Sequence, residues 1–259
     1  RLYGSDAASL SSARASIDAA KAQGGFVFIN HPSWTGQSPD GLVHLSAFHR
    51  KIIADKALDG IEVANGDMYS EEAFRIALES NLAIIGVSDI HGLIAWDYAT
   101  EFNGQNHTGE PGVRTATLVL ARERSADAIR AALVERASVA IRAKELYGRA
   151  RDLAPIVSGA VKLTLKPAVV EYGQTTSVFP LVVANAAPTP FTLRSVSQTQ
   201  GFGDATRTFT VPAHGSVTVK LTAVKAPDAL RTMTFEVLNA HVSPEKPLRL
   251  DLAVARAAE

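Results

Sequence analysis

The chain has no cysteine, and this absence excludes several kinds of site. Without any Cys among its 259 residues, it can form neither a disulfide framework nor a thiolate metal site. It also lacks net charge, because 26 Lys and Arg balance 26 Asp and Glu. A protein that binds nucleic acid through phosphate contacts usually has a basic excess, so this balance disfavours that class. The longest apolar runs have the length of a strand and are too short for a membrane span.

The first part of the chain alternates between strand-like and helix-like segments. Ser70 and Ser125 each precede acidic residues, which is typical of a helix N-cap followed by acids in the first turn. This alternation predicts βα units that form a parallel sheet or barrel. The expected strands are 26–30, 61–64, 83–87, 117–121 and 138–141, and the expected helices are 9–22, 45–57, 70–80 and 125–136.

From about Gly159 the hydrophobic pattern changes to a period of two. Segments such as "VKLTLKP" and "GSVTVKLTAV" alternate apolar and polar residues and are separated by Pro, Gly and Asn turns. Short strands without intervening helices predict a β-sandwich of the immunoglobulin or fibronectin type. We therefore expect two domains, an α/β domain over residues 1–157 and an all-β domain over residues 158–259.

Side chains that can bind metal ions lie at the ends of three expected strands. His31 follows the first strand in "INHP", and Glu62 lies in "DGIEVANG". Asp89 and His91 follow a third strand in "GVSDIHG". Functional side chains of parallel α/β folds gather at the carboxyl ends of strands, so we expect these residues at one edge. Imidazole and carboxylate groups together suit a divalent cation.

Each of these residues also has an interpretation without a metal. A histidine before proline is often a hydrogen-bonded loop residue, an Asp-x-His pair recurs by chance, and Glu62 can form a salt bridge at a strand edge. Their occurrence at successive strand ends favours a metal site. For the other histidines we expect surface or packing roles at His44 and His49, a loop over the site at His107, and structural roles at His214 and His241.

Several segments, in this order, resemble a known family. "GGFVFINHP", "DGIEVANG" and "GVSDIHG" are similar to the second half of PHP-domain phosphoesterases, the polymerase and histidinol phosphatase superfamily. "TATLVLARERSADAIRAAL" and "RASVAIRAKELYG" extend the resemblance to about residue 155. The bacterial phosphodiesterase branch, whose members often carry a C-terminal β-domain, fits best. The resemblance implies a partial distorted (β/α)7 barrel, followed here by an immunoglobulin-like sandwich.

The resemblance also implies a metal centre. Members of the family hold two or three divalent cations at the carboxyl-terminal mouth of the barrel. By this resemblance His31, Asp89 and His91 are metal ligands, and Glu62, at a recurrent position beside the site, is a further candidate ligand. Asp89 and His91 are the expected catalytic residues. Nitrogen and oxygen ligands of these kinds suit Mn, Zn or Fe.

The motifs that precede the strand-His-Pro element in this family have no counterpart here. The family's His-x-His pair is missing, since no histidine precedes His31. The chain begins "RLYGSDAASL", with neither an initiator Met nor a signal-peptide pattern. We expect that the first half of the barrel was removed or omitted, or that a companion N-terminal fragment or another copy in a homo-oligomer supplies it. Loss of the metals is the remaining alternative.

The expected activity is hydrolysis of small phosphodiesters by a metal-activated water. We expect Trp34 and Trp96 to form apolar walls for the substrate, Gln37 to donate a hydrogen bond, and Arg114 to hold phosphate. The polar segment 101–112 resembles a lid.

Two alternatives stay open for the function, namely a phosphomonoesterase of the histidinol-phosphatase kind and a metal-free degenerate barrel that serves as a binding or scaffold protein. The expected partner is a small phosphate ester rather than a nucleic acid. The absence of Cys and the sandwich favour a soluble protein of the periplasm or the cell exterior.

Overall fold

The computed structural model describes residues 6–91, 114–170, 177–196, 202, 207–222 and 230–257. The chain divides into two compact units, Arg1–Arg149 and Ala150–Glu259, and each is described by itself. In the described part of the chain, no helix combines the length and the apolar character that a membrane span requires.

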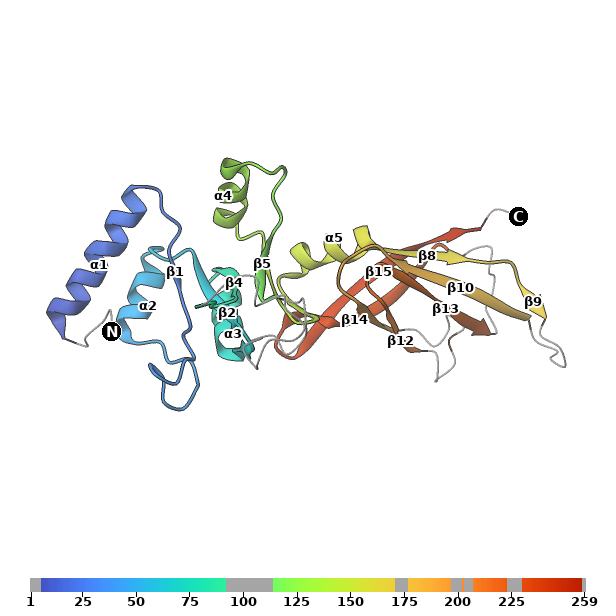
Figure 1. Ribbon diagram of the computed structural model, residues 1–259, viewed down its shortest axis with the longest axis horizontal. Coiled ribbons are helices and arrows are strands. Elements are labelled where there is room, and N and C mark those ends of the chain that lie inside the picture. Colours follow the sequence, from blue (N-terminus) through green and yellow to red (C-terminus); the bar gives the residue numbers. More distant parts are fainter. Residues whose placement is uncertain are drawn as a thin grey trace. The chain divides into compact units, whose positions relative to one another are not determined.

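Three parallel strands form the centre of the first unit (Figure 1). β1 (Phe28–Ile29) and β4 (Ala83–Val87) both pair in parallel with β2 (Gly60–Asn65), which lies between them. β3 (Met68–Tyr69) folds back antiparallel on β2. Every residue of β2 is buried, as expected of a parallel strand that is covered on both faces. The carboxyl ends of β1, β2 and β4 therefore lie at one edge of the sheet.

Polar N-caps begin the helices of this unit. At each helix the cap side chain accepts a hydrogen bond from a backbone N–H of the first turn, which satisfies a donor that the helix itself leaves free. The caps expected at Ser70 and Ser125 are confirmed. The helices are α1 (Ala7–Ala22, cap Asp6), α2 (Ala47–Ala54, cap Ser46), α3 (Glu71–Glu79, cap Ser70) and α4 (Ala126–Val134, cap Ser125).

The strands after β4 depart from the expected parallel arrangement. β5 (Ala116–Val119) and β6 (Ser138–Arg142) flank α4 in the sequence, yet they pair antiparallel, and β7 (Glu145–Tyr147) continues this sheet antiparallel to β6. A strand-helix-strand pattern alone predicted a parallel pair, because the alternation of segments carries no information about strand direction. The parallel prediction for this part of the chain is therefore wrong.

Side-chain hydroxyls connect β4 to these antiparallel strands. The Ile84 amide donates to Ser138 Oγ at 3.1 Å, and the Gly86 amide donates to Thr117 Oγ1 at 2.9 Å. The backbones of β4 and β5 approach each other closely here, since a Cβ on Gly86 would lie only 2.5 Å from the carbonyl oxygen of Ala116. Glycine at position 86 thus permits β4 to pack directly on β5.

The second unit is a β-sandwich preceded by helix α5 (Ala150–Ala160). α5 packs against β8, β14 and β15 of this unit, so the compact units divide at Arg149 and Ala150, ahead of the boundary that we expected at 157/158. The strands are β8 (Val161–Leu165), β9 (Val169–Val170), β10 (Ser177–Asn185), β11 (Phe191–Ser195), β12 (Thr208–Val211), β13 (Gly215–Thr222), β14 (Thr232–Ser243) and β15 (Lys246–Arg256).

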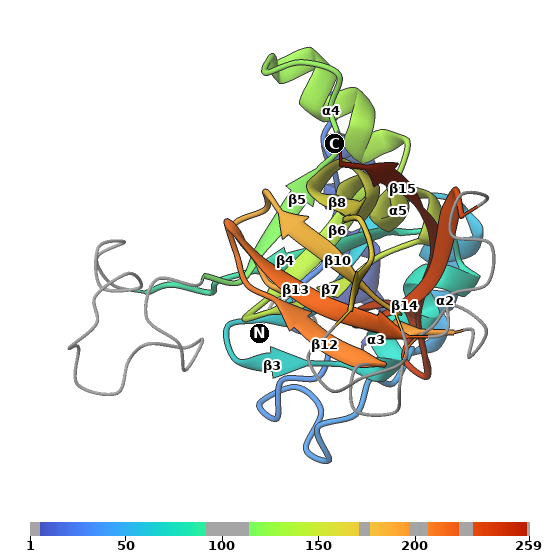
Figure 2. The ribbon, with the colours of Figure 1, turned by 90° about the vertical axis from the view of Figure 1, so that its right-hand side faces the viewer.

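β15 connects the two layers of the sandwich. In one layer β10 pairs antiparallel with β8, β9 and β13, as Figure 2 shows for β10 and β13. In the other, β11 pairs with β12 and β14. β15 pairs antiparallel with β14 over residues 246–253 and then parallel with β8 over residues 254–256. Buried side chains such as Leu181, Phe191 and Phe235 form the core, which the period-two pattern predicted.

Candidate active site

A tight turn follows β1 and carries His31. His31 has a positive φ of 29°, which residues other than glycine rarely adopt. The Trp34 amide donates to the His31 carbonyl oxygen at 3.0 Å, and the two rings meet edge to face with centroids 5.5 Å apart. Amide nitrogens approach both imidazole nitrogens, since Asn30 Nδ2 lies 2.9 Å from Nε2 and Gln37 Nε2 lies 3.4 Å from Nδ1. Trp34 itself is exposed.

Glu62 holds this turn from β2. Its side chain is buried, at 3% exposure, and Oε1 accepts hydrogen bonds of 2.8 Å from the His31 backbone amide and from Asn65 Nδ2. No described residue donates a hydrogen bond to Oε2. Burial raises the pKa of Glu62, and the hydrogen bonds from Asn65 and His31 oppose this rise. Glu62 therefore fixes the backbone that carries His31, through a buried carboxylate.

The segment after β4 carries the second group of candidate residues. Asp89 has a positive φ of 51°, and its Oδ1 lies 3.3 Å from His91 Nε2. Both side chains are exposed, His91 at 86% and Asp89 at 44%. Arg114 Nη2 donates to Ser88 Oγ at 2.7 Å. A guanidinium thus lies directly beside the end of β4.

Hydrogen bonds around Gly66 connect the strand ends to one another. The Gly66 amide donates to the Val87 carbonyl oxygen at 2.9 Å, and Thr115 Oγ1 donates to the Gly66 carbonyl oxygen at 2.6 Å. Gly66 has a positive φ of 53°, which glycine adopts without strain. These bonds join the end of β2 to the end of β4 and to the residue just before β5.

The structure places most of the candidate residues at one edge. His31 contacts Glu62, Asp89 contacts His91, and Arg114 contacts Ser88. Within the described ranges, however, no three His, Asp or Glu side chains come close enough together to hold a metal ion. Trp96, His107 and the expected lid at 101–112 lie outside the described residues.

Three further residues shape this edge, and the sequence pattern did not identify their roles. Asn65 supports Glu62, Thr115 holds the Gly66 carbonyl, and Ser88 accepts from Arg114. The available signal was a polar residue directly after an apolar strand, which Asn65 and Ser88 both provide. Thr115 precedes β5 and gave no such signal.

Comparisons with known proteins support both units. A family model, DUF5001, described as an Ig-like domain, matches residues 163–253. The chain is also similar to the crystal structure of a two-domain protein from Bacteroides vulgatus ATCC 8482 that contains a predicted PHP-like metal-dependent phosphoesterase, with 31% identity and a TM-score of 0.73. The match covers 97% of this chain and 67% of that chain. No curated protein matches. The expected α/β fold with an immunoglobulin-like sandwich is confirmed.

Proposed function

Because the chain belongs to the family of two-domain proteins with a PHP-like metal-dependent phosphoesterase domain, we propose that its first unit forms part of a site that hydrolyses small phosphodiesters. The observation that carries the proposal is the shared strand edge, where His31 follows β1, Asp89 and His91 follow β4, and Arg114 contacts Ser88. Metal-dependent phosphoester hydrolysis is the activity predicted for the Bacteroides protein, and the preference for diesters rests on the residues described below.

The donors at this edge fit a divalent metal ion in chemical type. Two imidazoles and a carboxylate, from His31, His91 and Asp89, suit Mn, Zn or Fe. They fall short in number, because no three ligands converge among the described residues. We therefore propose that these three residues supply some of the ligands of two or three ions. A companion fragment or a second copy of the chain would supply the other ligands. When bound, such ions supply hydroxide near neutral pH.

Other side chains of this edge would bind and orient the substrate. Arg114, beside Ser88, can donate two parallel hydrogen bonds to the non-bridging oxygens of a phosphate group. Trp34 offers an exposed apolar face next to His31, and Gln37 offers an amide beside the same ring. A diester carries one negative charge fewer than a monoester and a second organic group. The exposed aromatic wall of Trp34 is suited to the second organic group and therefore favours the diester.

The test compares hydrolysis of a diester and a monoester of p-nitrophenol by the intact protein, together with its metal content and mass. We expect Asp89→Ala to lower kcat/KM for the diester by more than about 100-fold, because a lost ligand disrupts metal binding. Asp127→Ala, in the first turn of α4, is the matched control and should retain activity. Equal activity of the two variants would refute the site assignment.

Two other results would favour the alternative functions. Preferential hydrolysis of the monoester would favour a phosphatase of the histidinol-phosphatase kind. A particle that has no bound metal, and whose ligand variants retain every measured property, would favour the scaffold interpretation.

A further inference from the structure

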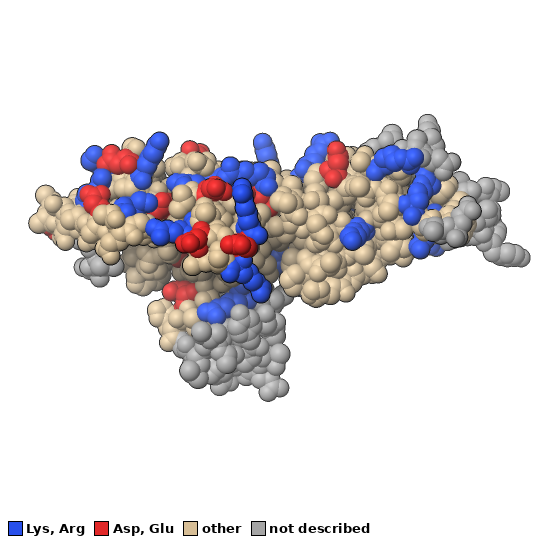
Figure 3. All heavy atoms as spheres, turned by 90° about the horizontal axis from the view of Figure 1, so that it is seen from above, with Lys and Arg blue, Asp and Glu red and all other residues tan. Residues whose placement is uncertain are grey.

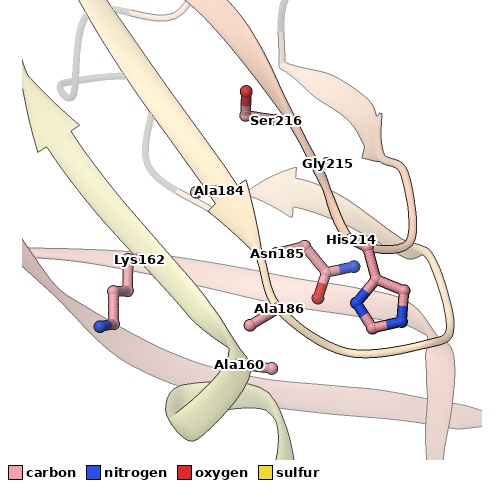
Figure 4. A pocket seen from close by; sticks show the side chains of 8 residues that line it. All are labelled: Ala160, Lys162, Ala184, Asn185, Ala186, His214, Gly215 and Ser216. Atoms are coloured by element: carbon pink, nitrogen blue, oxygen red, sulfur yellow. The ribbon is translucent and has the colours of Figure 1, made fainter.

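The second unit has an open hollow on the outer face of β8, β10 and β13 (Figure 4). Its volume is about 490 Å³. Lys162 lies on the β8 side of the hollow, and His214 and Ser216 lie on the β13 side. Small residues, Ala160, Ala184, Ala186 and Gly215, together with Asn185, complete the lining.

The strand register explains why a hollow forms here. Ala184 on β10 pairs with Lys162 on one side and with Ser216 on the other. Neighbouring strands lie roughly 4.8 Å apart, so the backbones that carry Lys162 and Ser216 are about 10 Å apart across Ala184. The methyl group of Ala184 leaves the space between the two longer side chains empty. The width suits one small polar group of a ligand.

Buried hydrogen bonds fix the floor of the hollow. Asn185 is buried, and its Nδ2 donates to the carbonyl oxygens of Thr189 and Pro212 at 2.8 and 3.1 Å. Its Oδ1 accepts from the Ala187 amide at 2.9 Å. The His214 amide donates to the Ala187 carbonyl oxygen at 3.0 Å, with a positive φ of 48° at His214. A backbone hydrogen bond therefore holds the turn that carries the imidazole at the end of β10.

The described residues of the strands around the hollow include lysines and no carboxylate. β8, β10 and β13 contain neither Asp nor Glu, and Lys162 forms no ion pair with any described carboxylate. Lys220 on β13 lies opposite Pro180 on β10, and the Lys166 amide donates a hydrogen bond to the Pro180 carbonyl oxygen. Pro180 lies four residues before Ala184 on β10, so these two lysines are about 13 Å from the hollow along the same face. Figure 3 shows mainly Lys and Arg on one face of this unit.

We propose that the hollow binds a sulfate or phosphate ester group of an acidic polysaccharide. Lys162, His214 and Ser216 each present a hydrogen-bond donor, and donors to a charged oxygen form the stronger hydrogen bonds. Lys166, about 13 Å further along the same face, can meet a further anionic group of the same polymer. This inference is independent of the proposed phosphoesterase activity, because its residues all belong to the second unit.

A polysaccharide fits this face better than a nucleic acid. Thr164 and Thr218 pair with Val182 on either side, so two hydroxyl groups lie on this face between Lys162 and Lys166. Such hydroxyls can hydrogen-bond sugar hydroxyls. The net charge of zero also disfavours a nucleic acid, whose binding depends on an excess of basic side chains.

Titration calorimetry with the intact chain tests this proposal, with dextran sulfate as the probe and uncharged dextran as the control ligand. We expect binding of dextran sulfate alone, weakened about 10-fold by Lys162→Ala, since one hydrogen bond to a charged group is lost. Lys246→Ala removes the same charge at the start of β15, away from the hollow, and should leave the affinity unchanged. His214→Ala should weaken binding without altering the circular dichroism spectrum.

Four outcomes would overturn the proposal. The first is no binding of dextran sulfate, and the second is an equal loss in Lys162→Ala and Lys246→Ala, which indicates nonspecific attraction between charges. The third is inorganic sulfate that binds as tightly as the polymer, which indicates a site for the free anion. The fourth is single-stranded DNA that binds more tightly than dextran sulfate.

Discussion

Replacement of Glu62 gives the sharpest test of how the edge of the first unit is built. Glu62→Ala removes a buried acceptor and leaves two donors, the His31 amide and Asn65 Nδ2, without their 2.8 Å partner. A buried donor left unsatisfied costs about 1–3 kcal/mol. Asn65 is buried and should incur this cost in full, whereas His31 is only half-buried and water can reach its turn. We therefore expect Glu62→Ala to lower the free energy of unfolding by about 2–4 kcal/mol.

Glu62→Gln is the matched control for this change. Its side-chain carbonyl oxygen can occupy the position of Oε1 and accept from the same two donors. The substitution also removes a buried negative charge, whose desolvation opposes folding. We expect the free energy of unfolding of Glu62→Gln to stay within about 1 kcal/mol of the unmodified chain.

Urea denaturation, followed by tryptophan fluorescence and by circular dichroism, measures both variants. Trp34 packs on His31, so its emission reports on the same turn. If Glu62→Ala and Glu62→Gln are equally stable, the two hydrogen bonds do not hold the turn and the reasoning fails. If both variants lose bound metal to the same extent while both keep the fold, Glu62 is a metal ligand, as the family resemblance allowed, rather than a support for His31.

Two further predictions concern the packing and the pH dependence of the first unit. Gly86→Ala should lower the free energy of unfolding by about 1–3 kcal/mol, since its Cβ would lie 2.5 Å from the Ala116 carbonyl oxygen. The control is Gly159→Ala, in helix α5 of the second unit with open space around it, which should raise the free energy of unfolding of that unit by about 0.5–1 kcal/mol. The opposite order in thermal unfolding would refute the packing argument. Burial lowers the pKa of His49 in the folded chain below its ordinary 6.5. As the pH falls below about 6.5, the unfolded chain therefore takes up the proton before the folded chain does, and the free energy of unfolding should decrease. His49→Gln should remove this loss in urea titrations at about pH 7.5 and about pH 5.5, and an unchanged pH dependence would contradict it.

The sequence predicted the elements of the first unit better than their directions. Ser70 and Ser125 indicated helix starts because an N-cap is a local interaction between residues three positions apart. The antiparallel pairing of β5 with β6 had no such local signal, because it depends on contacts such as the hydrogen bond from Gly86 to Thr117. Strand direction is thus a tertiary property in this unit.

The candidate site shows the same limit. His31, Asp89 and His91 could be proposed from the sequence because each lies shortly after an apolar strand. Whether they bind metal stays a prediction. The contact between Glu62 and the His31 amide joins two strands that lie about 30 residues apart along the chain. Hydrophobic periodicity could not predict this contact, because it describes only which face of a strand is buried. A buried carboxylate that supports a backbone turn could not be distinguished in the sequence from a metal ligand.

The hydrogen bonds that connect the ends of β1, β2, β4 and β5 also determine at which step backbone entropy is lost, folding or ligand binding. Fixing the backbone of one residue costs about 1–2 kcal/mol. At this edge Glu62 already restrains the His31 turn, and Gly66 already joins Val87 to Thr115. That cost therefore falls on folding and not on the arrival of a ligand. A substrate or ion that binds here would meet a backbone with few conformations left to lose.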